Sequence, residues 1–215
     1  MKQKEFSSPF NGISQPIIDH LAKTQQLICN ELELFEPTTT FQTDYWERPE
    51  GGGGRSCVLE HGATFEKAGV NISAIHGQIS TDKEANMFNQ LLNKINKPTI
   101  NLNQTNYLAT GISLVIHPKN PFVPTVHMNY RYFELQTPTE SIWWFGGGTD
   151  LTPYYMIEED AKHFHSTLKG LCDQSDTSYY PTFKQQCDTY FYLPHRNEHR
   201  GIGGIFYDYL HTQSQ

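Results

Sequence analysis

The chain has 215 residues, a formal net charge of −7 and an aromatic content of 13%. This length suits a single domain, and the aromatic content argues against disorder. The acidic balance argues against non-specific nucleic-acid binding, and no apolar run approaches the ~20 residues of a membrane-spanning helix. The first residues lack the apolar core of a secretory signal and the Arg-rich pattern of a transit peptide. We therefore expect a cytoplasmic protein whose four cysteines are free thiols.

The first part of the sequence predicts an arm, a helix and a loop. Residues 1–15 are expected to form a flexible arm. Pro16 is typical of the first turn of a helix, and apolar residues recur at helical spacing from there to about residue 34. Pro37 cannot continue that helix. Four consecutive glycines, Gly51–Gly54, predict a loop whose backbone can approach a ligand closely. The loop lacks the lysine of a phosphate-binding motif.

Beyond residue 57, alternating residue types predict strands, and apolar residues at helical spacing predict helices. The predicted extended segments are a hairpin at 58–65, then strands at 70–75, 105–117, 125–136 and 142–145, the last ending at Gly146–Gly148. Three more helices are predicted. The first follows the capping-box pair Thr81 and Glu84, the second covers 158–171, and the third starts at Pro181. This order predicts an α+β fold. We expect an antiparallel β-sheet flanked by helices on both faces, in a single domain over residues 16–215.

Polar side chains follow one another along the longer predicted strands. Because successive side chains of a strand point to opposite faces, His127, Asn129 and Arg131 share one face. Ser113 and His117 share a face of the preceding strand. Antiparallel pairing around the proline-rich turn between the two strands would bring His117 near His127. The pattern fits a built site, and it also fits a solvated face with incidental histidines.

Asp150 follows a segment of three aromatic residues and three glycines, Trp143–Gly148. A carboxylate beside an apolar wall needs a facing donor or cation, so Asp150 is a candidate catalytic group, although it could equally cap a tight turn. Ten histidines suggest a metal site, but their spacing matches no standard zinc motif. The polar segment that starts at His195 contains two arginines. With Arg55 and Arg131, these could bind carboxylates or form surface ion pairs.

Six collinear stretches carry a resemblance to a known family, and together they span about residues 44–210. They are WERPEGGGGRS (46–56), FEKAGVNIS (65–73), SLVIHPKNPFVPTVHMNYRYF (113–133), WWFGGGTDLTPY (143–154), the helix around 159–165, and HRNEHRGIGGIF (195–206). The sequence resembles the oxygen-dependent coproporphyrinogen III oxidases of haem biosynthesis.

The resemblance implies a homodimer that oxidatively decarboxylates two propionates of coproporphyrinogen III to vinyl groups, giving protoporphyrinogen IX. Dioxygen would be the co-substrate, with no organic cofactor. By resemblance, His127 is the proton donor and Asp150 holds the pyrrole N–H groups. The catalytic residues so implied are His127, Asp150 and Arg131. The implied substrate-binding residues are Ser113, Asn129, Tyr130 and Arg131. The implied ligands of a divalent, manganese-like metal ion are His117, His127, His165 and His195.

The sequence also departs from the family. Tyr-Asp-Tyr at 207–209 stands where the family has Phe-Asp-Asp. Members of the family continue well beyond the length of this chain, so we expect it to be C-terminally incomplete. Three hypotheses follow. The chain is an oxidase, or a catalytically inactive porphyrinogen-binding remnant, or an unrelated histidine–metal oxygenase on a β scaffold.

Overall fold

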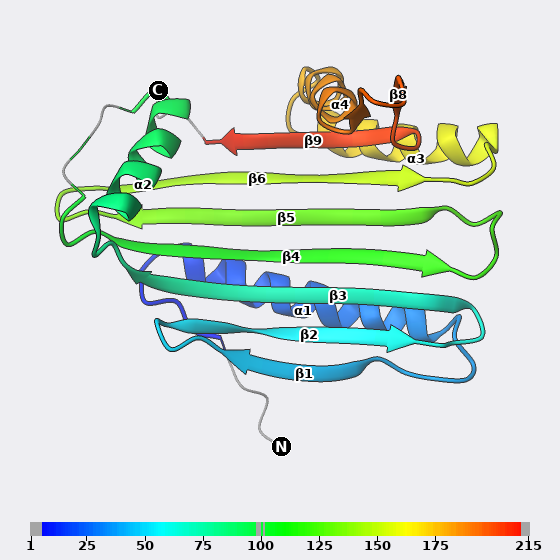
Figure 1. The fold of residues 1–215 in the computed structure, drawn as a ribbon, viewed down its shortest axis with the longest axis horizontal. Coiled ribbons are helices and arrows are strands. Elements are labelled where there is room, and N and C mark those ends of the chain that lie inside the picture. The colour runs from blue at the N-terminus through cyan, green and yellow to red at the C-terminus, as the bar shows by residue number, and fades with distance from the viewer. Residues whose placement is uncertain (1–5, 98–99, 101, 212–215) are drawn as a thin grey trace.

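The computed structural model describes residues 6–97, 100 and 102–211. A seven-stranded antiparallel sheet runs through it in the order β1-β2-β3-β4-β5-β6-β9, and β7 and β8 form a separate two-stranded ribbon (Figure 1). The strands are β1 (Gln42–Glu47), β2 (Gly52–Glu60), β3 (Phe65–Gln78), β4 (Asn106–Pro118), β5 (Thr125–Gln136), β6 (Ser141–Thr152), β7 (Tyr192–Leu193), β8 (Glu198–His199) and β9 (Gly203–Leu210). The helices are α1 (Ser14–Glu33), α2 (Asp82–Lys94), α3 (Glu158–Asp173) and α4 (Tyr179–Tyr190). The predicted α+β fold with an antiparallel sheet is confirmed.

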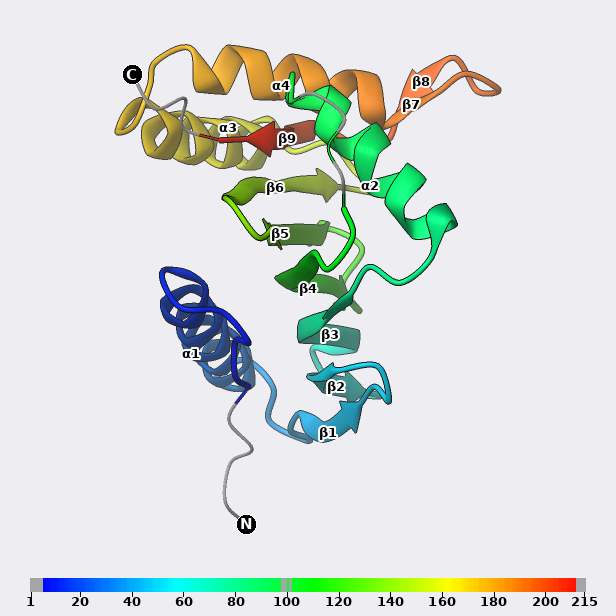
Figure 2. The same ribbon diagram turned by 90° about the vertical axis from the view of Figure 1, so that its left-hand side faces the viewer.

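Helix α1 covers one face of the sheet (Figure 2). Its apolar stripe packs Cys29 into a core with side chains of β2, β3 and β4. The buried Gln25 ties the helix to two strands, since its Nε2 donates to Arg55 O at 2.9 Å and to Val70 O at 2.7 Å. The Arg55 side chain also faces α1, because its Nε donates to Gln25 Oε1 at 2.6 Å. Arg55 therefore lies on the opposite side of the sheet from the polar residues of β5.

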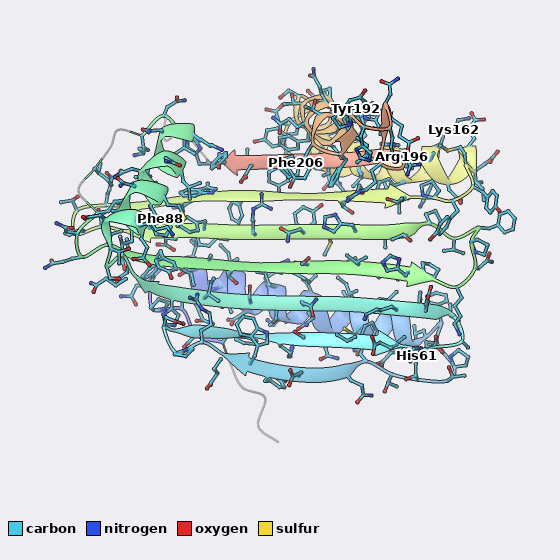
Figure 3. The ribbon with its side chains drawn as sticks, viewed as in Figure 1. His61, Phe88, Lys162, Tyr192, Arg196 and Phe206 are labelled. Atoms are coloured by element: carbon cyan, nitrogen blue, oxygen red, sulfur yellow. The ribbon has the colours of Figure 1, made fainter. Side chains whose placement is uncertain are left out.

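Helix α2 covers one end of the other face, so helices lie on both faces as predicted (Figure 2). The predicted capping box is confirmed, because Thr81 Oγ1 accepts from Glu84 N at 3.2 Å and Glu84 Oε2 accepts from Thr81 N at 3.0 Å. Phe88 and Leu92 are buried against apolar side chains at the ends of β5 and β6. Figure 3 shows Phe88 over this end of the sheet. The polar residues of β4 and β5 occupy the remainder of the face.

Helices α3 and α4 pack on β9, where Leu168, Phe183 and Ile205 share a small core. Between β8 and β9 the chain turns tightly against β6. Gly201 has a φ of +62°, and a Cβ added there would lie 2.0 Å from Leu151 O. The turn therefore requires glycine. It brings the residue before it, Arg200, close to the end of β6.

Two glycine runs form strands, so the predictions for them are wrong. Three of the four glycines from 51 to 54 lie in β2, and β6 continues through 146–148 to Thr152. Neighbouring rings explain why. A Cβ at Gly54 would lie 2.2 Å from the ring of its pair Trp46, and one at Gly147 would lie 2.3 Å from that of Tyr130. Glycine thus makes room for a cross-strand ring. The hairpin predicted at 58–65 is confirmed as the turn between β2 and β3, whereas the segment predicted as a further strand at 70–75 is the continuation of β3.

The described part of the predicted arm is packed. Phe10 is buried with Ile18 and Tyr132 in a core cluster. Ser8 Oγ and Ser14 Oγ lie 2.8 Å apart, and Ser8 N donates to Gln15 Oε1 at 2.7 Å. Residues 6–13 thus fold back onto the start of α1, while residues 1–5 lie outside the described residues.

The Glu36 carboxylate joins the end of α1 to the β2–β3 turn. It accepts hydrogen bonds from the backbone and hydroxyl of Thr38 and from the backbone N–H groups of Ala63, Thr64 and Phe65. Burial raises the pKa of this carboxyl, but these hydrogen bonds outweigh burial and lower the pKa from 4.5 to about 2.

We expect Glu36→Gln to lower the melting temperature at neutral pH, with the difference from wild type shrinking as the pH falls from 4.5 to about 2. The sign follows from the depressed pKa. The ionised carboxylate stabilises the fold above its ordinary pKa, and that contribution is lost as it takes up a proton. Thermal unfolding between pH 2 and 7 measures this, with the exposed Glu31→Gln as control. A difference that stays constant across this range would contradict the prediction.

Candidate active site

The uncovered part of the second sheet face gathers the polar side chains of three strands. Ser113 of β4 lies opposite Asn129 of β5, and His127 of β5 lies opposite Asp150 of β6. His117 shares this face, because it lies two residues beyond Val115, the β4 partner of His127. The antiparallel pairing that the sequence analysis considered for β4 and β5 is therefore present, and it puts the polar sides of the two strands on one face.

Asp150 lies at the centre of a hydrogen-bonded chain of three residues. His127 Nδ1 lies 2.8 Å from Asp150 Oδ1, and Arg200 Nη2 donates to Asp150 Oδ2 at 2.9 Å. The carboxylate is fully buried. Phe191 covers the chain, since Arg200 Cζ stacks 3.8 Å from the centre of its ring and His127 meets the ring edge-on. A buried carboxylate requires such compensation.

The hydrogen bond to Asp150 sets the tautomer of the His127 ring. An ionised carboxylate only accepts hydrogen bonds, so Nδ1 of His127 carries its hydrogen toward Asp150. The other ring nitrogen, Nε2, is then the atom that can give or take a proton. The His127 side chain is one-third exposed, so Nε2 is within reach of a bound molecule. Both carboxylate oxygens of Asp150 are engaged by neighbouring side chains, which suits support of His127 better than direct contact with a ligand.

Arg131 is held in place from two sides. Its Nη1 donates to Asn129 Oδ1 at 3.0 Å, and its Nη2 lies 3.1 Å from Asp208 Oδ2 on β9. Gly146 makes room for this pair, because a Cβ there would lie 2.5 Å from Asp208 Oδ1 and 2.9 Å from Arg131 Nε. The side chain is 40% exposed, so further N–H donors of a fixed guanidinium are available to an anion.

A groove of about 370 Å³ runs from Arg131 across the sheet to β1. It is lined by Trp46, Ser56, Asn71, Ser113, Asn129 and Arg131, among others. Gly111, opposite Arg131 in the sheet, leaves part of the floor without side chains. The volume is within the range of small-molecule sites.

Tyr130 points away from this groove. It packs against the core under α1, on the opposite face from His127 and Arg131. Burial raises the pKa of its hydroxyl. Of the implied substrate contacts, Ser113, Asn129 and Arg131 line the groove, and Tyr130 does not.

A comparison of the sequence with known protein families identifies the family of this protein. A family model described as coproporphyrinogen III oxidase matches residues 17–215. The chain belongs to the coproporphyrinogen III oxidase family.

Relatives within the coproporphyrinogen III oxidase family include animal and plant enzymes. The chain is 52% identical over 197 residues to an oxygen-dependent coproporphyrinogen-III oxidase of Drosophila melanogaster, covering 91% of this chain and 49% of the relative. It is 49% identical over 196 residues to the mitochondrial enzyme of Homo sapiens, covering 91% and 42%. It is 48% identical over 200 residues to the chloroplastic enzyme of Glycine max, covering 91% and 50%. The chain thus spans half the length of these relatives or less. In its described residues, no helix is long and apolar enough to cross a membrane.

The four histidines implied as metal ligands are not gathered into one group among the described residues. His165 on α3 uses both ring nitrogens, with Ile202 O at 3.0 Å from Nε2 and the Tyr180 hydroxyl at 3.0 Å from Nδ1. His127 is engaged with Asp150, and His195 lies in the turn between β7 and β8. Among the described residues, no three His, Cys, Asp or Glu side chains are placed to hold a metal ion. This arrangement does not fit the implied ion, so no reaction step below is assigned to it.

Sequence reasoning missed two members of the site. Arg200 was noted only as one arginine of a polar segment, and Asp208 only as part of a departure from the family. Asp150 and Arg200 are 50 residues apart, and their contact depends on the turn at Gly201. The sequence signal for Asp208 was its position two residues after Phe206, which places both side chains on one face of an extended segment. The structure shows that this segment, β9, pairs with the glycines of β6.

Proposed function

We propose that this chain carries the catalytic face of an oxygen-dependent coproporphyrinogen III oxidase. In the proposed reaction, two propionates of coproporphyrinogen III become vinyl groups, and the product is protoporphyrinogen IX. The observation that carries the proposal is the His127–Asp150–Arg200 chain on the same sheet face as the groove. His127 lies two residues along β5 from Asn129, which lines that groove together with Arg131. Membership of the family supports it.

The groove matches the chemistry of the proposed substrate. A porphyrinogen is a flexible apolar macrocycle that carries four carboxylates and four pyrrole N–H groups. The flat floor at Gly111 and the ring of Trp46 suit the macrocycle. The guanidinium of Arg131 suits a propionate, and Ser113 adds a hydroxyl donor beside it. The charge of Arg131 is partly balanced by Asp208, so an incoming propionate would compete with that carboxylate.

Each decarboxylation consumes one propionate carboxylate, one dioxygen and one proton, and yields a vinyl group, carbon dioxide and hydrogen peroxide. We propose that dioxygen attacks the electron-rich pyrrole after loss of an N–H proton. The bound peroxide then removes a hydrogen from the propionate carbon next to the ring, and loss of carbon dioxide leaves the double bond. Nε2 of His127 would take up the pyrrole N–H proton and pass it to the departing peroxide, and the one proton consumed overall, which comes from solvent, restores the pyrrole N–H. The groove holds the ring and the oxidant close together.

A homodimer, a cytoplasmic location and the absence of an organic cofactor are part of the same proposal. The alternative is that the chain binds a porphyrinogen without converting it. Turnover under air and under anaerobic conditions separates the two.

The test uses the purified chain with coproporphyrinogen III, and follows protoporphyrinogen formation and release of carbon dioxide. We expect product under air and none without dioxygen. His127→Ala should abolish turnover and leave binding nearly unchanged. Binding without turnover under air would support the alternative, and a chain that neither binds nor converts the substrate would contradict both.

A further inference from the structure

Asn71 has a buried amide oxygen with an unmet hydrogen-bonding capacity. Its Oδ1 is inaccessible to solvent and has no hydrogen-bond partner among the described residues. An unpaired buried acceptor costs about 1–3 kcal/mol, and native proteins keep few of them. The side chain lies in the middle of β3, with Ser56 opposite it on β2 and Ser113 opposite it on β4. Within the described part of the chain, no hydrogen bond accounts for an amide oxygen at this position.

The position of Asn71 is the floor of the groove. Ser56, Asn71, Ser113 and Asn129 form one straight row across four strands. Asn71 and Asn129 are separated by two strand spacings, or about 10 Å. A macrocycle whose propionate reaches Arg131 therefore has its centre over the β3–β4 part of this row. The amide torsion χ2 of asparagine is soft, so a rotation brings Oδ1 from its buried position toward the groove.

The centre of a porphyrinogen presents N–H donors, and these require acceptors. The resemblance assigned that role to Asp150, but both oxygens of Asp150 are engaged, by His127 and by Arg200. Asn129 Oδ1 is engaged by Arg131. Of the two amide side chains that line the groove, Asn71 is therefore the one whose oxygen is uncommitted.

We propose that the Asn71 amide oxygen accepts a hydrogen bond from a pyrrole N–H of the bound tetrapyrrole, and so positions the ring in the groove. This inference rests on the proposed function for its ligand class. Asn71 is a positioning residue and not a catalytic one, because a neutral amide does not take up the pyrrole proton. It holds the macrocycle so that a propionate lies at Arg131 and a pyrrole lies below His127.

The test measures binding of two unreactive probes, so that it does not depend on turnover. The probes are coproporphyrinogen III kept without dioxygen, which is metal-free and carries four pyrrole N–H donors, and the nickel chelate of coproporphyrin III, whose ring nitrogens carry no hydrogen. Quenching of tryptophan fluorescence reports binding. We expect Asn71→Leu to weaken the metal-free probe about tenfold, as loss of one hydrogen bond implies, and to leave the affinity for the nickel chelate unchanged. Asn71→Asp, which keeps an acceptor, should bind the metal-free probe better than Asn71→Leu.

A merely structural role predicts a different pattern. If Asn71 only packs in the sheet, Asn71→Leu will weaken both probes equally or neither, and either result overturns the proposal. The exposed Asn93→Leu on α2 is the matched control and should leave both affinities unchanged. Because the substitution removes an unpaired buried acceptor, the melting temperature of Asn71→Leu should not fall. A wild-type chain that binds neither probe would contradict this inference together with the proposed function. Probe binding with the expected pattern but without turnover would contradict only the reaction.

Discussion

Asp150→Asn is expected to lower kcat for coproporphyrinogen III by about 10²–10⁴-fold, the range found when the residue that orients a catalytic histidine loses its charge. KM should change much less, because the fully buried carboxylate has both oxygens engaged by protein groups. An amide in its place can accept from only one of His127 and Arg200 and directs N–H hydrogens at the other. The His127 ring would then present the wrong nitrogen to the groove.

Steady-state kinetics under air measure this effect. Asp44→Asn is the matched control, because Asp44 lies on the same sheet face, on β1, and is exposed. Its kcat should equal that of wild type. A folded Asp150→Asn variant with unchanged kcat would show that the His127–Asp150–Arg200 chain is only structural.

Arg131→Leu is expected to raise KM by about 10–100-fold, since a hydrogen bond to a charged group contributes about 1.5–3 kcal/mol. Two effects act in the same direction. The propionate loses its guanidinium partner, and Asp208, which now pairs with Arg131 at 3.1 Å, becomes an unbalanced negative charge at the same place. The kcat should fall less than KM rises, because Arg131 does not contact His127 or Asp150 in the described hydrogen bonds.

The double variant Arg131→Leu/Asp208→Asn separates these two effects. It should recover part of the lost affinity, because it removes the repulsion without restoring the attraction. Arg196→Leu is the control. Arg196 pairs with Glu198 in the β7–β8 ribbon, where Figure 3 labels it, and it is not one of the residues that line the groove. Unchanged KM in Arg131→Leu would remove Arg131 from the substrate site.

Local patterns predicted the parts of the fold that depend on near neighbours. The capping box at Thr81 involves residues three apart. Alternation alone placed Ser113 and His117 on one face of their strand, and His127 and Asn129 on one face of theirs, before any pairing was known. Antiparallel pairing through a short turn then brought the right strands together. The apolar spacing along α1 also depends on near neighbours, and it predicted that helix almost to its ends.

The predictions for the glycine runs were wrong because the residues that require glycine there lie on another strand. Glycine alone favours a loop, but Gly54 and Gly147 lie in strands because the rings of Trp46 and Tyr130 occupy the space that a side chain would need. The prediction of the site missed Arg200 and Asp208 for the same reason. Each reaches the polar face only through the pairing of β9 with β6, and that pairing depends on how α3 and α4 return the chain.

The amide of Gln25 has a consequence for how large ligands reach the sheet. Its bonds to the carbonyls of Arg55 and Val70 hold α1 at one position along two strands, and a slide by one residue would shift the helix by about 1.5 Å and break both. A helix fastened in this way does not act as a movable cover. The two ends of the row Ser56, Asn71, Ser113 and Asn129 therefore stay on the face of the sheet that α1 does not cover.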